Sequence, residues 1–597
     1  MSWQLRSVFK EAARLLPTAM IILAATLLPQ LVVHAAESEY VWAQALTRAS
    51  YANSSDVALD SSDNIYVTGY FQGTADFDPG PGTVNLSAVG GIDVFVCKYD
   101  ALGSLVWARS MGSTGSDYAY GVAVDAAGNV HTTGVFSLTA DFDPGSGTTN
   151  LSSSGSFDVF VWKLNASGNL VWARSMGGNS DDTGKSIAVD AAGNVYTTGS
   201  FFQTADFNPG SGTTNLTSAG ISDVFVCKLN ASGNLVWARG MGSTNWDEGM
   251  SVSADSAGNV HTTGSFRGTV DFDPGPGTTN LTAAAQDIFV SKLNSSGNLL
   301  WARSMGGAGY DKGHGLTLDG TGNVYTTGYF EGTADFDPGP GTTNLTAIGF
   351  RDVFISKLNN SGNLLWARSI GGAGYDIGQG LTLDGTGNVY TTGYFEGTVD
   401  FDPGPGATNL SGPGLADAFV TKLDTGGDFL WARVWGGTSG DMVNGVSLDS
   451  LGSVYTAGFF AGTADFDPGP GTTNLTAMGT GDGFLLKLSG PDITPPNATS
   501  IIPATTGPTQ GVDFEFTVTF DEEVQNFDVL DDLLISGPAP TGASFDSSDN
   551  VTFTVTLTGI TGNGSLTLAV DTGGDVEDLA GNPLASSVTS APVTIDN

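Results

Sequence analysis

The stretch DFDPGPGTTNLT at residues 271–282 recurs unchanged at residues 335–346 and 465–476. Versions with a few substitutions begin at Asp76, Asp141, Asp206 and Asp400. A loop that recurs along one chain indicates a repeat architecture, in which each unit needs its neighbours to cover its apolar face. The period of the sequence therefore decides the fold.

One tryptophan marks each repeat. These residues follow one another at intervals of 65, 65, 65, 64, 65 and 65, and they are Trp42, Trp107, Trp172, Trp237, Trp301, Trp366 and Trp431. Each period holds four short segments rich in Val, Thr, Leu and aromatic residues, such as residues 315–319, 323–330, 352–359 and 363–369. Such segments, bounded by Gly, Asn and Asp, predict β-strands. Four short strands repeated seven times predict an all-β fold with a seven-bladed β-propeller.

The phase of the repeat predicts how the ring closes. Residues 39–46 have the pattern of a fourth strand, whereas the last repeat ends with a third strand at residues 482–488. We expect these two segments to pair. Each unit also exceeds the ~40–45 residues of a minimal blade, and the surplus is the DFDPG loop between the second and third strands.

Two motifs carry a resemblance to a known family. DIFVSKLNSSGNL at residues 287–299 and DGTGNVYTTG at residues 319–328 resemble the SBBP-type β-propeller repeats of bacterial exported proteins. The resemblance extends over residues 40–490. It implies a structural or interaction module with no catalytic residues common to the family. The DFDPG loop departs from the family pattern, so its purpose stays open.

The N-terminal segment predicts export. Arg6, Lys10 and Arg14 precede an apolar run over residues 15–33, which ends in the small-residue stretch VHAAES. This order predicts a signal peptide over residues 1–36, cleaved near Ala35 or Ala36. An uncleaved membrane anchor is the alternative, which Pro17 and Pro29 disfavour. We expect a secreted or cell-surface protein without a membrane span after signal removal.

Beyond the propeller, predicted over residues 37–490, a proline-bearing linker occupies residues 491–497. Alternating strand patterns then follow at residues 512–524, 550–559 and 564–571. They predict an Ig-like β-sandwich over residues 498–597. The stretches DITPP and VEDLAGNPL resemble bacterial Ig-like modules, which implies a stalk or adhesion spacer.

The net charge of −40 restricts the partners. Binding to nucleic acid needs clustered Lys and Arg, so nucleic acid is excluded and a cation or an uncharged partner is favoured. The repeated lysines and the arginines of the WAR motifs are expected to be scaffold charges paired with the repeated aspartates. An extracellular glycan or protein is the expected partner.

The connections between blades share one face with the DFDPG loops, and they differ from unit to unit. A repeated aspartate is followed three residues later by Tyr120, Lys185, Met250, His314, Gln379 and Asn444. This variation points to selectivity. The candidate ligand-binding residues are Tyr120, Lys185, Trp246, Tyr310, Lys312, His314 and Tyr375.

The sequence lacks a repeated nucleophile and a Ser–His–carboxylate pattern, so we assign no catalytic residues and predict no enzyme. The leading hypothesis is an exported, non-enzymatic scaffold or adhesin-like binding protein. Its acidic propeller face would meet glycan, protein or cations. The alternative is an extracellular carbohydrate-active enzyme with its site at the channel mouth near Lys312 and His314.

The DFDPG loops have two compatible interpretations. Asp-Pro-Gly is a favourable turn, and Asn208 in the third loop keeps the turn cap while losing the charge. Paired carboxylates around a rim are also hard oxygen ligands that suit calcium. The candidate calcium ligands are Asp76, Asp78, Asp141, Asp143, Asp271, Asp273, Asp335, Asp337, Asp400, Asp402, Asp465 and Asp467.

Overall fold

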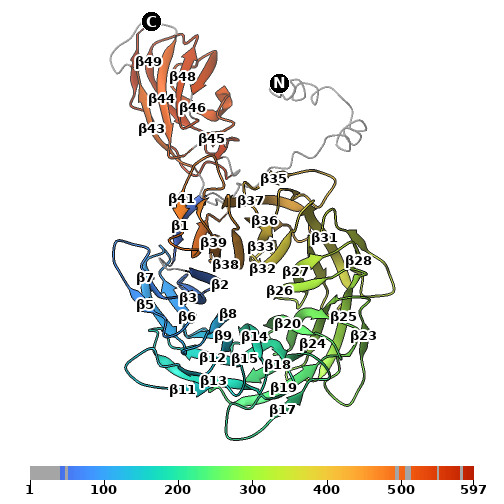
Figure 1. Cartoon of the computed structure of the whole chain (residues 1–597). Helices are drawn as coiled ribbons and strands as arrows, with labels where there is room; N and C mark the ends of the chain where they lie inside the picture. The colour runs from blue at the N-terminus through green and yellow to red at the C-terminus, as the bar shows by residue number, and fades with distance from the viewer. Residues whose placement is uncertain are drawn as a thin grey trace. The chain divides into compact units, whose positions relative to one another are not determined.

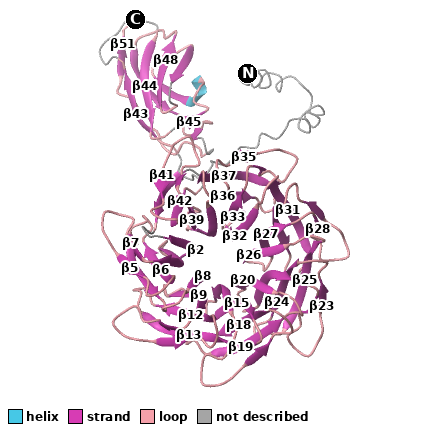
Figure 2. Ribbon diagram, viewed as in Figure 1, coloured by secondary structure: helices cyan, strands magenta, loops and turns pink. Residues whose placement is uncertain are grey.

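The structure, a computed structural model, describes residues 40–46, 51–490, 496–504, 513–522, 524–547, 550–578 and 582–596. The predicted signal peptide, residues 1–36, lies outside them, as do residues 491–495 of the predicted linker. The chain divides into two compact units at Gly490. The prediction of an all-β protein is confirmed, because η1 (Leu530–Asp532) is the only helix of the described residues (Figure 2). None of these residues forms a helix long and apolar enough to cross a bilayer.

Strand pairing within residues 40–46 and 51–490 gives seven four-stranded antiparallel blades arranged in a ring (Figure 1). Their innermost strands line a central channel. From the channel outward, the first blade contains β2 (Tyr51–Leu59), β3 (Ile65–Gln72), β6 (Asp93–Tyr99) and β7 (Leu105–Met111). The second contains β8 (Tyr118–Val124), β9 (Val130–Phe136), β12 (Asp158–Leu164) and β13 (Leu170–Gly178). The third contains β14 (Thr183–Val189), β15 (Val195–Phe201), β18 (Asp223–Leu229) and β19 (Leu235–Met241). The fourth blade contains β20 (Glu248–Ala254), β21 (Val260–Phe266), β24 (Asp287–Leu293) and β25 (Leu299–Gly307). The fifth contains β26 (Lys312–Leu318), β27 (Val324–Phe330), β30 (Asp352–Leu358) and β31 (Leu364–Gly372). The sixth contains β32 (Ile377–Leu383), β33 (Val389–Phe395), β36 (Asp417–Leu423) and β37 (Phe429–Gly437).

The last blade contains both ends of the propeller. Its strands, again from the channel outward, are β38 (Met442–Leu448), β39 (Val454–Phe460), β42 (Asp482–Leu488) and β1 (Tyr40–Ala45). Strand β1 pairs antiparallel with β42, with Ala43 opposite Leu486. The Trp42 ring also meets Tyr455 edge-on, at 6.2 Å between ring centroids. The predicted closure is confirmed, and backbone hydrogen bonds join the two ends of the ring.

Removing residues 37–47 should destabilise the whole propeller, because β42 loses its outer partner and the ring loses its closing contact. The thermal midpoint should fall by many degrees in scanning calorimetry, far more than loss of a flexible terminus would cause. Trp42→Ala should also lower the midpoint. Val41→Ala is the matched control, because the Val41 side chain is 45% exposed. An unchanged midpoint in the truncated protein would show that closure does not support the ring.

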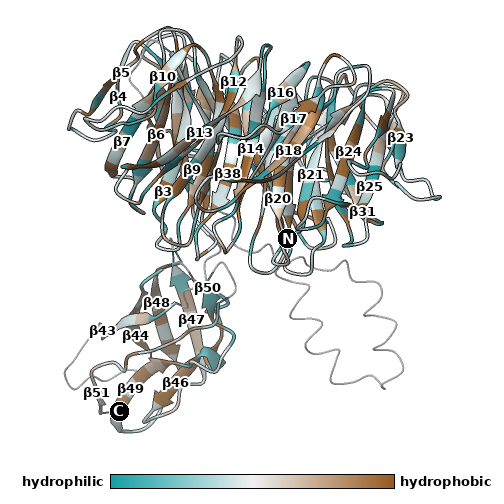
Figure 3. Cartoon of the chain, turned by 90° about the horizontal axis from the view of Figure 1, so that it is seen from below, coloured by the Kyte–Doolittle hydropathy of each residue, from teal (hydrophilic) through white to brown (hydrophobic). Residues whose placement is uncertain are grey.

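Each DFDPG loop folds into a small two-stranded ladder, here called the loop ladder. These ladders are β4 (Thr74–Asp76) with β5 (Asn85–Ser87), β10 (Thr139–Asp141) with β11 (Asn150–Ser152), β16 (Thr204–Asp206) with β17 (Asn215–Thr217), β22 (Thr269–Asp271) with β23 (Asn280–Thr282), β28 (Thr333–Asp335) with β29 (Asn344–Thr346), β34 (Thr398–Asp400) with β35 (Asn409–Ser411) and β40 (Thr463–Asp465) with β41 (Asn474–Thr476). In side view, labelled ladder strands such as β4, β5, β16 and β17 lie along one edge of the ring (Figure 3).

The loop ladder joins neighbouring blades. The end of β13 pairs with β16 of the next blade, with Gly177 opposite Asp206 and Gly178 opposite Ala205. The same pairing connects β25 with β28, β31 with β34 and β37 with β40. The surplus length of the repeat therefore extends a blade's sheet across the junction to its neighbour.

The phenylalanine of each DFDPG loop, which stands between two aspartates or, in the third loop, between Asp206 and Asn208, closes the core. Strand alternation places the aspartates on one side of the ladder and the phenylalanine on the other. Phe272 is fully buried, and its ring lies 5.3 Å from that of Phe266 and 5.0 Å from that of Phe289. Burying a phenylalanine contributes roughly 1.5–3 kcal/mol. The equivalent residues are all fully buried: Phe77, Phe142, Phe207, Phe336, Phe401 and Phe466.

The repeated cations are scaffold charges, as expected, but of two kinds. Lys98 lies 3.5 Å from Asp60 and over the Tyr66 ring. The expected aspartate pairing is thus confirmed for Lys98 and for Lys163, Lys292, Lys422 and Lys487. Among the WAR arginines, Arg368 pairs with Asp428 at 3.3 Å, but the pairing is wrong for Arg109. Arg109 instead stacks on Trp107 and donates to the Gly168 carbonyl in the turn of the next blade, at 2.9 Å, because that turn presents its carbonyl oxygens to the neighbouring outer strand.

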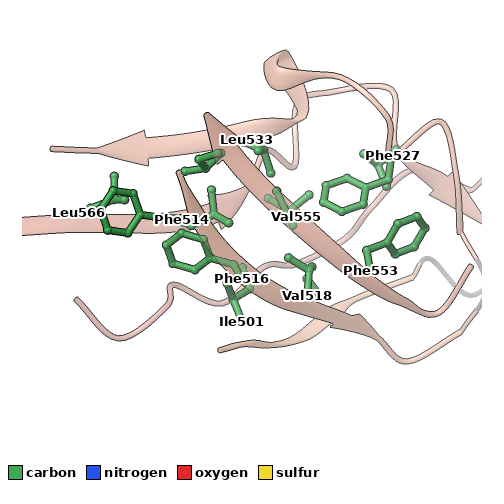
Figure 4. Packing of buried hydrophobic residues seen from close by; sticks show 14 of the residues in the cluster. Ile501, Phe514, Phe516, Val518, Phe527, Leu533, Phe553, Val555 and Leu566 are labelled. Carbon is green, nitrogen blue, oxygen red and sulfur yellow. The ribbon is translucent and has the colours of Figure 1, made fainter. Parts of the chain in front are cut away.

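The C-terminal unit is a β-sandwich. Its sheets contain β43 (Ala498–Pro503), β44 (Phe514–Phe520), β48 (Thr552–Thr558) and β47 (Gly542–Ser547); β46 (Leu533–Ser536), β49 (Gly564–Val570) and β51 (Val593–Ile595); and β45 (Val524–Gln525) with β50 (Glu577–Asp578). The inward side chains form one apolar core that includes Phe516, Val555 and Leu566 (Figure 4). Alternating apolar residues along β44 and β48 produce this core, as the sequence predicts.

Candidate functional site

A cavity of about 370 Å³ opens into the propeller channel. One residue from each blade lines it at the same repeat position, and together these residues are called the channel ring: Ser55, Tyr120, Lys185, Met250, His314, Gln379 and Asn444. The seven positions hold seven different residue types. The repeat therefore varies where its innermost strands face the cavity.

The local fold explains why these positions are free to vary. Each channel-ring residue lies on an innermost strand, which pairs within its blade on one side only. In three blades the next residue along the strand, Asp56, Ser186 or Ser251, bonds to the adjacent blade instead. Asp56 Oδ2 accepts the Val122 N–H of the next blade at 2.9 Å, and Ser186 Oγ accepts the Val252 N–H at 3.2 Å. Burial raises the pKa of Asp56 to about 7.

Charge in the cavity is asymmetric. The Lys185 ammonium lies 4.2 Å from the centroid of the Tyr120 ring, a cation–π contact that carries no opposite charge. Lys312, which lies two blades further along the chain, instead forms an ion pair with Glu248 at 2.6 Å. Burial lowers the pKa of Lys185, and Glu248 opposes that shift. Lys185 is therefore the cation that this cavity offers to a ligand.

His314 is a neutral hydrogen-bonding group in this structure. Burial, assisted by the charge of Lys312, lowers the pKa of His314 to about 3. Its Nδ1 lies 3.0 Å from the Gly378 carbonyl oxygen. A carbonyl only accepts, so Nδ1 carries the proton and Nε2 is an acceptor. The ring also packs edge-on against Tyr329.

Amides and tyrosines complete the lining. Asn444 Nδ2 donates to Asn53 Oδ1 and to the Ser54 carbonyl oxygen, each at 2.9 Å. These bonds cross the junction between the last blade and the first. Tyr70, on β3, is also part of the wall. Asn444 is thereby held in one orientation, which favours selective hydrogen bonding over adaptable contact.

The predicted ligand-binding residues divide into three groups. Tyr120, Lys185 and His314 line the cavity. Lys312 is held by Glu248. Trp246, Tyr310 and Tyr375 lie outside the cavity lining, on the exposed connections between blades.

Sequence reasoning missed Ser55, Asn53 and Tyr70. The repeat spacing gives Ser55 directly, because it precedes Tyr120 by one period of 65 residues. Tyr70 is harder to find, because it reaches the cavity from β3, the second strand of its blade. The repeat pattern does not indicate which residue of a second strand extends to the cavity.

The aspartates of the DFDPG loops cap turns. Asp271 Oδ1 accepts the backbone N–H groups of Asp273 and Thr279, and Asp273 Oδ1 accepts that of Gly275 at 2.8 Å. Asn208 makes the same bond to the Gly210 N–H at 2.9 Å. Among the described residues, no group of three or more His, Cys, Asp or Glu side chains is placed to hold a metal ion. The capping interpretation accounts for the repeated aspartates, and calcium binding stays a prediction.

Replacing Asp273 by Asn should leave the thermal midpoint nearly unchanged, because an amide oxygen caps the turn as Asn208 does. Asp273→Ala should cost about 1 kcal/mol through loss of the hydrogen bond. Thermal melts of both variants and the parent, each with and without calcium, measure the effect. Calcium ligation would instead stabilise the parent by about 2.7 kcal/mol at a hundredfold excess over Kd. A calcium-dependent rise that Asp273→Asn removes would contradict a purely structural role.

A second set of aspartates is buried at the blade junctions. Asp182 Oδ2 accepts the Gly178 N–H at 2.7 Å and Oδ1 accepts the Phe202 N–H at 3.1 Å, which fixes the connection between blades. Asp158 accepts the Ser154 N–H through Oδ2, whereas its buried Oδ1 has no hydrogen-bond partner in the described structure. Burial raises the pKa of Asp158 to about 6 and that of Asp182 to about 7, the latter with a contribution from Asp158.

These carboxyls should make the propeller less stable at higher pH. Their folded pKa lies above the value of about 4 in an unfolded chain, so their stabilisation is complete below that value and is lost as pH rises through about 6 to 7. The thermal midpoint should fall between about pH 5 and pH 8. His131, His261 and His314, with lowered pKa, oppose this trend but are outnumbered by the buried aspartates.

Asp158→Asn is the matched test of that trend. Asn keeps the acceptor for Ser154 and removes the buried charge. The variant should melt higher than the parent at about pH 8 and depend less on pH, whereas Asp273→Asn should keep the parental slope. A midpoint that rises from about pH 5 to pH 8 in the parent would contradict this assignment.

Comparisons with known proteins agree with this architecture. Residues 171–200, 300–329 and 365–394 match the model of a beta-propeller repeat, and residues 492–594 match that of a bacterial Ig-like domain. The chain carries SBBP-type beta-propeller repeats and a bacterial Ig-like domain. Such a combination fits a binding or scaffold protein.

Curated relatives are distant. An uncharacterized WD repeat-containing protein of Acanthamoeba polyphaga mimivirus is 24% identical over 71% of this chain and 36% of its own length. Regulatory protein FlaEY of Caulobacter vibrioides is 25% identical over 56% of this chain and 35% of its own length. This chain thus covers about a third of each.

One solved structure is a protein of unknown function from Bacteroides caccae, which is 11% identical. The match covers 57% of this chain and 89% of that protein, with a TM-score of 0.28. The assignment of the repeats therefore rests on the repeat models and on the strand pairing described above.

Proposed function

We propose that this protein is an exported, non-enzymatic binding protein, with a scaffold or adhesin-like role, that holds its ligand at the mouth of the propeller channel. The channel ring carries this proposal. Its seven equivalent positions hold seven residue types, whereas the buried phenylalanines of the loops repeat without change. Selective recognition requires such differences, and a purely structural ring does not.

The chemistry of the cavity suits a polar ligand with several hydroxyl or amide groups. Lys185 supplies a charged donor, His314 Nε2 an acceptor, and Gln379 both kinds of group. The volume of about 370 Å³ lies within the roughly 300–1,000 Å³ of small-ligand sites. A single sugar residue or a short polar side chain of a protein partner has this character.

Binding without turnover fits the cavity better than the carbohydrate-active alternative. A general acid or base works best with a pKa near the operating pH. His314 has its pKa lowered to about 3, and the Lys312 ammonium is occupied by Glu248. His314 therefore lacks the protonation behaviour that the alternative needs, and Lys312 is held in an ion pair.

Export and surface location belong to the same proposal. The predicted signal peptide over residues 1–36 and the bacterial Ig-like domain at residues 492–594 support them. The net charge of −40 disfavours polyanionic partners, since like charges repel. Extracellular glycans, proteins and cations are partner classes compatible with this charge.

The full chain, labelled on an exposed amine, should bind members of a printed glycan and peptide array, and a variant carrying Tyr120→Ala and Lys185→Met should lose those signals. The removed groups face the cavity, so the variant should keep the parental thermal midpoint. Thr321→Ala, in a tight turn on the opposite face, is the control and should bind as the parent does. Mass spectrometry should find each bound ligand unchanged after incubation.

Two results would contradict the proposal. Signals that survive in the double variant would place the binding elsewhere on the molecule. A product that forms with the parent and is lost in His314→Ala would establish an enzyme instead.

A further inference from the structure

Three neighbouring blade junctions display exposed aromatic side chains beside the channel mouth. Trp246, Tyr310 and Tyr375 occupy one repeat position, with side chains 45%, 46% and 39% exposed. The other junctions have Tyr51, Ser116, Asp181 and Gly440 there. Trp246, Tyr310 and Tyr375, together with Phe350, are called the aromatic sector. It occupies one continuous part of the ring, which is the arrangement expected for an elongated ligand.

The backbone beneath the aromatic sector is fixed. Tyr310 and Tyr375 form backbone bridges with Gln286 and Arg351 of the preceding blade. Their N–H groups also donate to Glu331 and Glu396, each at 3.3 Å. Trp246 bridges to its own preceding blade in the same way. A pre-organised surface loses little conformational entropy on binding. The fixed backbone therefore favours binding of a ligand to these rings.

A guanidinium group lies over two of these rings. The Arg267 guanidinium stands 5.2 Å from the Tyr310 centroid and donates to Gln286 Oε1 at 2.7 and 3.0 Å. At the next junction, Arg351 lies over Tyr375 and pairs with Glu331 at 2.9 Å. Tyr310 and Tyr375 thus each have a guanidinium over one face of the ring, with hydrogen-bonding groups next to it.

Phe350 enlarges the aromatic surface at Tyr375. Its ring stacks on Tyr375 at 5.1 Å with an interplanar angle of 7°. Phe350 is 65% exposed, so its outer face is open to a ligand. At the other end of the sector, Phe202 packs edge-on against Trp246 at 5.5 Å and supports that ring.

We propose that the aromatic sector binds a neutral linear oligosaccharide, with sugar rings stacked on successive blades. The apolar C–H face of a sugar ring packs on an aromatic ring, while its hydroxyl groups bond to side chains at the margin. Exposed aromatic patches mark interaction sites. A protein partner would favour one contiguous apolar core, whereas these rings stand on separate blades with polar groups between them.

The aromatic sector is continuous with the channel cavity. Trp246, Tyr310 and Tyr375 each precede a channel-ring residue of the same blade by four positions. An oligosaccharide on the sector would therefore lie along the edge of the cavity, whose hydroxyl-compatible lining would contact the sugar groups nearest to it. The inference rests on the proposed function, because it places the ligand on the same face.

Calorimetric titration of the full chain with cellohexaose, xylohexaose, mannohexaose and maltohexaose tests the inference. At least one hexasaccharide should bind, and Trp246→Ala and Tyr310→Ala should each weaken that binding about tenfold, as expected for loss of roughly 1.4 kcal/mol. Tyr310→Phe should bind as the parent does, because stacking needs the ring and not the hydroxyl.

Leu300→Ala is the control, since this side chain is 51% exposed on an outer strand away from the sector. Binding of a hexasaccharide could survive Trp246→Ala and Tyr310→Ala but be lost in the Tyr120→Ala, Lys185→Met variant. That result would contradict oligosaccharide binding by the aromatic sector and would leave the proposed function in place. Failure of all four sugars, with array signals that still depend on the channel ring, would also overturn the sector alone. Loss of binding in Tyr310→Phe would overturn stacking.

Discussion

Neighbouring blades are joined where the loop ladder of one blade pairs with the outer strand of the blade before it, and the loop's phenylalanine fills the apolar core between the two blades. Asp206 pairs with Gly177 across the junction, and the fully buried Phe207 packs 4.8 Å from Phe225 inside its own blade. A propeller is stable only when every junction is covered, since each blade exposes two apolar faces. The acidic, glycine-rich loop is therefore a structural connector. Its aspartates cap the turn, its glycines permit the turn, and its phenylalanine fills the core.

A ring stabilised at its junctions leaves the innermost strands free to vary. His314 and Asn444 bond to the next blade, whereas Met250 and Gln379 line the cavity, so a change at Met250 or Gln379 costs little stability, as is usual for surface substitutions. The same holds for Trp246 on its exposed connection. Stability and recognition thus use different positions of one repeat, and this separation allows seven nearly identical blades to form a single asymmetric site.

Local patterns predicted the repeats, the strands and the closure, because period and alternation depend only on neighbouring residues. The variable position that holds Tyr120 and Lys185 was also visible, since it breaks an otherwise regular repeat. Contacts between blades could not be predicted from these local patterns. That Arg109 reaches the Gly168 carbonyl, and that Asp158 approaches Asp182, depend on how one blade is placed against the next. Tyr70 escaped prediction for the same reason, because it reaches the cavity from a second strand.

Hydrogen–deuterium exchange of the full chain, with and without an array ligand, tests the central claim most directly, because it locates the binding face without any substitution. Exchange should slow in residues 244–251, 308–316 and 373–381, where the aromatic sector joins the channel ring. It should stay unchanged in the tight turns at residues 319–323 and 359–363. Slower exchange confined to those turns, or to the C-terminal sandwich, would contradict the assignment of the channel mouth as the binding site.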